Sequence, residues 1–161
     1  MLADVLFLAA VLPLSLYAGL SDLRTMTIPN WISIALIVAF IVIAPFFLPF
    51  ETVLWRLGAA FGVLAIGFVL NAMGTLGGGD AKYLAAITPY ISLQDAPSFL
   101  FIFAIALLGT LLVHRIAMRI GPLRRATSDW ASWSAGRNFP MGTSIAAAII
   151  AFLVLRIVNG G

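Results

Sequence analysis

Cysteine is absent from this chain of 161 residues, and charged residues are scarce, at 9%. The lack of cysteine excludes disulfides, cysteine-ligated zinc and thiol catalysis. The chain has one histidine and six acidic residues, so it offers few metal ligands, and we expect neither a metal nor another cofactor. The formal charge is +3, but no basic face is interleaved with exposed aromatic residues, so nucleic-acid binding is not indicated.

Apolar residues dominate what is present. They make up 63% of the chain, and the mean hydropathy is +1.13. A soluble domain has roughly half apolar and a quarter charged residues. Spans that face lipid should be helical, because unpaired backbone groups are not tolerated in hydrocarbon. The sequence therefore predicts an all-α polytopic membrane protein, a bundle of transmembrane helices that forms a single domain over residues 1–161.

Six apolar stretches are separated by short polar breaks, and we expect a bundle of six transmembrane helices. The expected spans are at about residues 2–20, 31–48, 53–73, 80–91, 97–118 and 140–158. We expect the first stretch to be a true span and not a cleavable signal peptide, because Asp4 replaces the positive charge of such segments. Residues 50–52 should form a tight turn. In the third span, Gly58 and Gly62 have a spacing that lets membrane helices pack closely.

The longest polar stretch, residues 115–138, contains five arginines as well as Trp130 and Trp133. Tryptophan and arginine both favour the membrane interface, so we expect this stretch to lie there. The arginines are interpreted mainly as a topology signal, with binding of anionic lipid as the alternative. His114 is interpreted as an interfacial residue.

Basic residues are distributed unevenly between the two membrane sides that six spans define. One side receives Arg24, Lys82, Arg115, Arg119, Arg124, Arg125 and Arg137, and the other receives only Arg56 and Arg156. The positive-inside rule makes the first side cytoplasmic, so both termini should be periplasmic. Asp22 and Asp80 then both lie on the cytoplasmic side.

Asp80 follows a run of three glycines directly after the third apolar stretch. A carboxylate beside a membrane span is costly without a partner or water, so it indicates function. Its expected partner is Asp22, which comes just after the first span. Two adjacent carboxylates cannot both ionise comfortably, and one therefore becomes an acid and the other a base. Such a pair can activate water for peptide cleavage without a metal.

Helix dipoles give a first assignment of the two roles. Asp22 is expected to follow the C-terminal end of a helix, where an anion is disfavoured, and Asp80 to begin a helix, where it is favoured. This favours Asp80 as the base and Asp22 as the acid, although a dyad titrates as a unit. Alternatively, Asp80 is only a helix N-cap and Asp22 a loop residue paired with Arg24.

The residues around the aspartates also have alternative interpretations. The glycines permit either a close backbone approach or positive φ, which suits an extended substrate strand beside the acid. They lack the spacing of a phosphate-binding loop. Lys82 either balances the dyad, contacts an acidic substrate side chain, or is an interfacial lysine whose stem lies in the apolar layer.

Two motifs resemble those of type IV prepilin peptidases, in particular the short form associated with tight-adherence (Flp-type) pili. The first is Asp22-Leu23-Arg24 leading to Ile28-Pro29-Asn30, and the second, Gly77-Gly78-Gly79-Asp80-Ala81-Lys82, resembles the G-x-G-D signature of intramembrane-type aspartyl proteases. Phe139-Pro140-Met141-Gly142-Thr143-Ser144-Ile145-Ala146 is similar to a third, weaker family pattern, with Met141 where tyrosine is usual. The likeness covers nearly the whole chain.

The resemblance implies a membrane-embedded aspartic endopeptidase with Asp22 and Asp80 as its catalytic dyad. Residues expected to support the site or contact substrate are Gly77, Gly78, Gly79, Lys82, Arg24, Pro29 and Asn30. The family removes a short basic leader from pilin or pilin-like precursors at the cytoplasmic face of the inner membrane. Many longer relatives also methylate the new amino terminus. This chain lacks their cysteine-bearing domain, which argues against methyl transfer.

Two other functions are compatible with the same residues. One is a related peptidase for archaeal preflagellin-like precursors, which the sequence does not separate well from the first. The other is a small proton-coupled transporter or assembly subunit with Asp22 and Asp80 as proton carriers. Carriers should lie near the middle of the bilayer and be reachable from both sides, so the expected position of both acids at one face disfavours transport.

Overall fold

The computed structural model of the chain describes residues 1–135 and 139–160, and this part is helical with no strand. The α-helices are α1 (Leu2–Thr25), α2 (Asn30–Ile43), α3 (Phe50–Ala72), α4 (Gly78–Ile87), α5 (Ala96–Ala117), α6 (Gly121–Ala126) and α7 (Met141–Val158). Three short 3-10 helices are η1 (Ala44–Phe46), η2 (Thr88–Tyr90) and η3 (Ala131–Trp133). The predicted all-α class is confirmed.

Within the described residues, four helices are long and apolar enough to cross a membrane: α1, α3, α5 and α7. The apolar stretch of α2 and η1, Asn30–Phe46, is shorter, and α4 has only 10 residues. Several long apolar helices fit a multi-pass membrane protein. The count of six spans remains a prediction.

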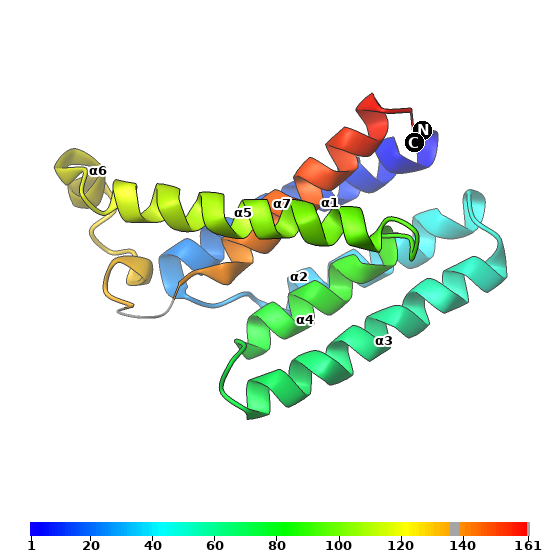
Figure 1. The fold of residues 1–161 in the computed structure, drawn as a ribbon, viewed down its shortest axis with the longest axis horizontal. Coiled ribbons are helices and arrows are strands. Elements are labelled where there is room, and N and C mark those ends of the chain that lie inside the picture. Colours follow the sequence, from blue (N-terminus) through cyan, green and yellow to red (C-terminus); the bar gives the residue numbers. More distant parts are fainter. Residues whose placement is uncertain (136–138, 161) are drawn as a thin grey trace.

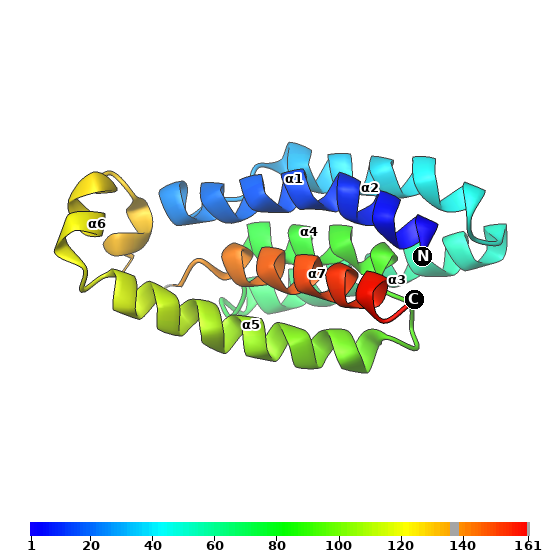
Figure 2. The same cartoon turned by 90° about the horizontal axis from the view of Figure 1, so that it is seen from above.

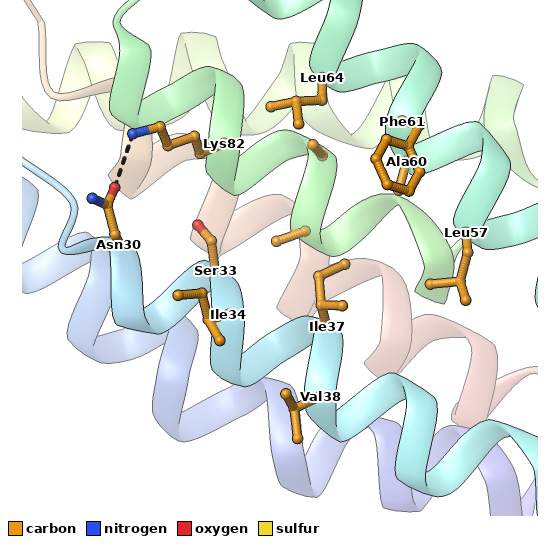
Figure 3. A pocket seen from close by; sticks show the side chains of 12 residues that line it. Asn30, Ser33, Ile34, Ile37, Val38, Leu57, Ala60, Phe61, Leu64 and Lys82 are labelled. Carbon is orange, nitrogen blue, oxygen red and sulfur yellow. Dashed lines mark hydrogen bonds between the residues drawn. The ribbon is translucent and has the colours of Figure 1, made fainter.

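The helices form an elongated bundle in which α7 lies between α1 and α5 (Figures 1 and 2). Helix α4 packs against α2, α3 and α7, so it lies inside the bundle despite its shortness. Its Tyr83 and Ile87 side chains are completely buried. An isolated helix of this length is marginal in water, and its stability here comes from packing against α2, α3 and α7.

Three helix boundaries differ from the expected ones. Helix α1 continues through the polar residues to Thr25 and ends at Met26, which has φ 55° and donates its N–H to the Asp22 carbonyl at 2.9 Å. The expected break at residues 21–30 therefore shrinks to a short link. The expected turn at residues 50–52 is wrong, because α3 already begins at Phe50, directly after the extended Pro49. Helix α4 begins at Gly78, two residues before the expected start of that span.

The close packing expected at Gly58 and Gly62 is also wrong. Both residues are exposed, and a Cβ added to either would meet nothing within 4 Å. The tight contact of α3 lies at Gly67, where an added Cβ would come within 2.8 Å of Ala81 Cβ on α4. The glycine spacing alone does not show which helix face packs.

The two chain ends lie together at one end of the bundle (Figures 1 and 2). There, Arg156 of α7 binds Asp4 of α1 at 3.0 Å and also pairs with Asp95, while the Met1 ammonium lies 3.1 Å from Asp4. This ion cluster (Met1, Asp4, Asp95 and Arg156) ties α1, the start of α5 and α7 together. The membrane side on which it lies remains a prediction.

The polar stretch after α5 forms α6 and η3 at the opposite end (Figure 1). The Trp130 and Trp133 rings stack on each other, with centroids 5.8 Å apart, and Trp133 also stacks on His114. Arg137, counted above in the charge distribution, lies outside the described residues.

Candidate active site

Asp22 lies in the last turns of α1 and is almost completely buried, with 5% of its surface exposed. Its Oδ2 atom accepts a hydrogen bond from the backbone N–H of Gly142 at 2.7 Å. Gly142 is the second residue of α7, and the N–H groups of a first helical turn have no partner within their own helix. The start of α7 therefore supplies a donor for the Asp22 carboxylate.

Asp80 is the third residue of α4 and is half-buried. The N-cap of this helix is Gly77, and no side chain caps it. The Asp80 carboxylate lies over Gly77, where an added Cβ would come within 2.5 Å of Oδ2. Gly77 therefore makes room for the carboxylate.

Ile28, in the short link between α1 and α2, connects the two aspartate sites. A Cβ added to Gly79, next to Asp80, would be 3.5 Å from Ile28 Cβ. A Cβ added to Gly142 would be 2.6 Å from Ile28 Cδ1 and 2.9 Å from Asp22 Oδ2. The side chain of Ile28 thus contacts glycines from both aspartate sites, and Asp80 lies within electrostatic reach of the Asp22 carboxylate.

Neither aspartate has a basic partner in the part of the chain that the structure describes, where every ion pair belongs to the cluster at the other end. Arg24 is exposed and forms no ion pair with Asp22. The Lys82 Nζ atom donates to Asn30 Oδ1 at 3.0 Å. The structure therefore brings Asn30 and Lys82 together but leaves Arg24 outside, while Pro29 serves as the N-cap of α2.

These positions overturn the simpler interpretations of both aspartates. Asp22 is a helical residue and not a loop residue paired with Arg24, and Asp80 is not an N-cap. The expectation that a helix dipole disfavours an anion at Asp22 considered only the C-terminal end of the first helix. The Asp22 carboxylate lies at the N-terminal turn of α7, where an anion is favoured.

The glycines before Asp80 provide space and not unusual backbone angles. Gly77 has φ −66°, and the positive-φ glycines among the described residues are Gly74 and Gly160. Gly78 faces the Asn71 side chain at ordinary contact distance, 3.6 Å from an added Cβ. Of the two expected roles, close approach applies here.

Sequence reasoning assigned no role to Ile28 or Gly142. Both residues lie inside stretches that it quoted as motifs. Ile28 could have been noticed in the sequence, because it is an apolar residue within a polar break. No such signal marked Gly142, because its contact with Asp22 joins residues 120 positions apart.

The arrangement favours acid–base chemistry. Two sequence-remote carboxyl groups lie near one another without a neutralising cation, and one of them receives a backbone N–H. Such a pair can share a proton and act on a water molecule. Among the described residues, no three acidic or histidine side chains come together to hold a metal ion.

The family model described as the type IV leader peptidase family matches residues 8–113, which include both aspartates and reach from α1 into α5. Comparison with curated proteins and with solved structures gave no significant match. The family resemblance inferred from the motifs is confirmed. Since the match covers well over half of the chain, the protein belongs to the type IV leader peptidase family.

Proposed function

We propose that the protein is a membrane-embedded aspartic endopeptidase, with Asp22 and Asp80 as its catalytic dyad. The observation that carries the proposal is that Ile28 lies against both aspartate sites, 3.5 Å from a Cβ added to Gly79 next to Asp80 and 2.6 Å from a Cβ added to Gly142, whose N–H binds Asp22. Neither carboxyl group has a basic partner among the described residues. Clusters of this kind are typical of active sites, since a purely structural carboxylate is normally paired.

The proposed reaction is hydrolysis of one peptide bond. One carboxylate accepts a proton from water while the water oxygen attacks the carbonyl carbon, and the other carboxyl group donates its proton to the carbonyl oxygen. The tetrahedral intermediate then collapses: the base passes the proton it took from water to the leaving nitrogen, and the C–N bond breaks. As the carbonyl re-forms, one hydroxyl group of the intermediate returns a proton to the other carboxylate. The dyad returns to its initial state with one proton shared.

We assign Asp22 as the base and Asp80 as the acid, the reverse of the assignment from the sequence. The Gly142 N–H donates to Asp22 Oδ2, and a hydrogen bond to the ionised form favours that form. Both carboxyl groups lie near a helix N-terminus, so the direct hydrogen bond makes the difference between them.

The proposed substrates are pilin or pilin-like precursors, whose short basic leader is removed at the cytoplasmic face of the inner membrane. Membership of a leader peptidase family supports this substrate class. The proposed side of the membrane follows from the basic residues. Arg115 is in the last turn of α5, and Arg124 and Arg125 are in α6, at the end of the bundle opposite the chain termini (Figure 1).

The test is co-expression with such a precursor, with leader removal followed by immunoblotting. Asp22→Asn and Asp80→Asn should each lower cleavage by about 10²- to 10⁴-fold, the usual contribution of a general acid or base. Asp129→Asn is the matched control, because Asp129 is exposed and lies after α6. Cleavage at the wild-type rate in either dyad variant would refute the mechanism.

A further inference from the structure

Helix α7 lies outside the residues 8–113 that match the family model, yet its packing against α1 is the most extensive helix contact among the described residues. Helix α1 carries Asp22, and the N–H of Gly142 in the first turn of α7 donates to the Asp22 carboxylate. Because this donor is a backbone group, the hydrogen bond depends on how the first turn of α7 is held against α1. Groups that hold this turn therefore bear on the proposed reaction.

Thr143 holds the first turn of α7 through its side chain. Its Oγ1 atom donates to the Gly19 carbonyl oxygen of α1 at 3.1 Å. Gly19 comes three residues before Asp22, which corresponds to about 4.5 Å along the axis of α1. Since Thr143 directly follows Gly142, two consecutive residues of α7 bind α1 at two neighbouring points.

The contact around these two hydrogen bonds consists of small residues. Ala18 and Gly19 of α1 are buried, as are Gly142 and Ala146 of α7. A Cβ added to Gly19 would be 3.5 Å from Ala146 Cβ and 3.5 Å from the Cα atom of Thr143. Small residues let membrane helices approach closely. The short Thr143 side chain can therefore reach the backbone of α1.

The Thr143 hydroxyl bond differs from the usual contact of a threonine in a helix. Such a threonine commonly bonds to a carbonyl oxygen one turn earlier in its own helix. Thr110 of α5 does so, with a bond to the Ala106 carbonyl at 2.7 Å. Thr143 donates to another helix instead, so its bond stabilises the contact between α7 and α1 and not α7 alone.

We propose that Thr143 is a positioning residue of the active site, whose hydroxyl anchors the first turn of α7 on α1 and so keeps the Gly142 N–H on the Asp22 carboxylate. The inference rests on the proposed function and adds to it a residue outside the range 8–113. Without the anchor, the first turn of α7 can shift along α1, and the hydrogen bond to Asp22 weakens. The expected cost falls on the chemical step and not on binding of the precursor.

The test compares Thr143→Val with Thr143→Ser in cleavage assays on purified protein in detergent, with a pilin-type precursor as substrate. Valine keeps the branched shape and loses the hydroxyl, whereas serine keeps the hydroxyl. We expect Thr143→Val to lower kcat about three- to tenfold, the worth of one hydrogen bond, with KM unchanged. Thr143→Ser should restore most of the loss. Wild-type kcat in Thr143→Val, equal losses in both variants, or a change confined to KM would overturn the proposal.

Thr110→Val is the matched control for an effect on stability alone. It removes a hydroxyl that lies 2.5 Å from Ser144 Oγ and so links α7 to α5, which carries neither aspartate. We expect it to lower the melting temperature in detergent and to leave kcat per folded molecule unchanged. If Thr143→Val and Thr110→Val lowered kcat per folded molecule equally, Thr143 would only stabilise the packing of α7, and the proposal would be wrong.

The dyad variants separate failure of this inference from failure of the proposed function. Cleavage that is lost in Asp22→Asn and Asp80→Asn but unaffected in Thr143→Val would reject the role of Thr143 and leave the peptidase proposal standing. Cleavage that persists in the dyad variants, or is absent from the wild type, would reject the peptidase proposal, and the role of Thr143 would fall with it.

Discussion

The two ends of the bundle differ in whether their acidic side chains have basic partners. At the end with the termini, Arg156 pairs with Asp4 and Asp95, and Arg56 donates to the Pro89 carbonyl at 3.1 Å. At the other end, Asp22 and Asp80 have no basic partner among the described residues. The buried His114 Nε2 and Ser132 Oγ atoms there also lack a hydrogen-bond partner within the described part.

The difference supports the proposal that one end of the bundle is structural and the other contains the active site. Buried polar groups are nearly always satisfied in folded proteins, so unsatisfied groups indicate a site at which something else binds or reacts. Proteins keep such local inconsistencies mainly at functional sites. The ion cluster holds α1, α5 and α7 together, whereas the two carboxyl groups of the proposed dyad have no basic partner among the described residues.

Among variants that keep both carboxyl groups, the largest effect is expected at Gly142, where the dyad end has no room for a side chain. In Gly142→Ala, the new Cβ would lie 2.6 Å from Ile28 Cδ1 and 2.9 Å from Asp22 Oδ2, so one of them must move. A displacement of about 1 Å at a reacting group can cost about 10²-fold in rate. We therefore expect kcat/KM for leader removal to fall by about that factor.

Two further variants are the controls for this prediction. Gly109→Ala on α5 makes the same change where an added Cβ meets nothing within 4 Å, and it should leave cleavage unchanged. Ile28→Val removes the Cδ1 atom that the new methyl group would meet, and it should partly restore Gly142→Ala. Full activity in Gly142→Ala alone would show that the contact with α7 does not position Asp22.

The opposite pattern, a loss of stability without a loss of specific activity, is expected at the ion cluster. Arg156→Gln leaves Asp4, whose side chain is 10% exposed, with only the Met1 ammonium nearby, and it removes the cation paired with Asp95. Loss of a charged partner at a largely buried site should lower the free energy of unfolding by about 1–3 kcal/mol. The measurement is the melting temperature in detergent, together with cleavage per folded molecule.

The exposed Arg119→Gln is the matched control and should change neither quantity. If Arg156→Gln abolished cleavage while the melting temperature stayed the same, the separation between a structural and a functional end would be wrong.

The sequence predicted the features of this protein that depend on composition and order along the chain. Long apolar runs predicted the long helices. Alternation of successive spans placed Asp22 and Asp80 at the same end, because antiparallel helices bring their connecting ends together. The glycine run before Asp80 indicated either a close approach or positive φ, and the Asp80 carboxylate lies close over Gly77.

Features that depend on three-dimensional packing could not be predicted in this way. Hydropathy marks the apolar part of a helix and not its end, so the polar last turns of α1, which contain Asp22, were expected to be a loop. Glycine spacing did not show that α3 packs at Gly67 while Gly58 and Gly62 face outward. The hydrogen bond from Gly142 depends on how α7 packs against α1, which no local pattern records.

The smallest effect is expected at Gly77, whose neighbour is a side chain that can move. In Gly77→Ala, the new Cβ would lie 2.5 Å from Asp80 Oδ2, so the carboxylate must leave its present rotamer. An off-rotamer side chain costs about 0.5–1.5 kcal/mol, which corresponds to about a two- to tenfold fall in kcat. Gly78→Ala is the control in the same run of glycines, because its Cβ would make only an ordinary contact with Asn71, at 3.6 Å. Equal kcat values for the two variants would show that the position of the Asp80 carboxylate over Gly77 is not the reactive one.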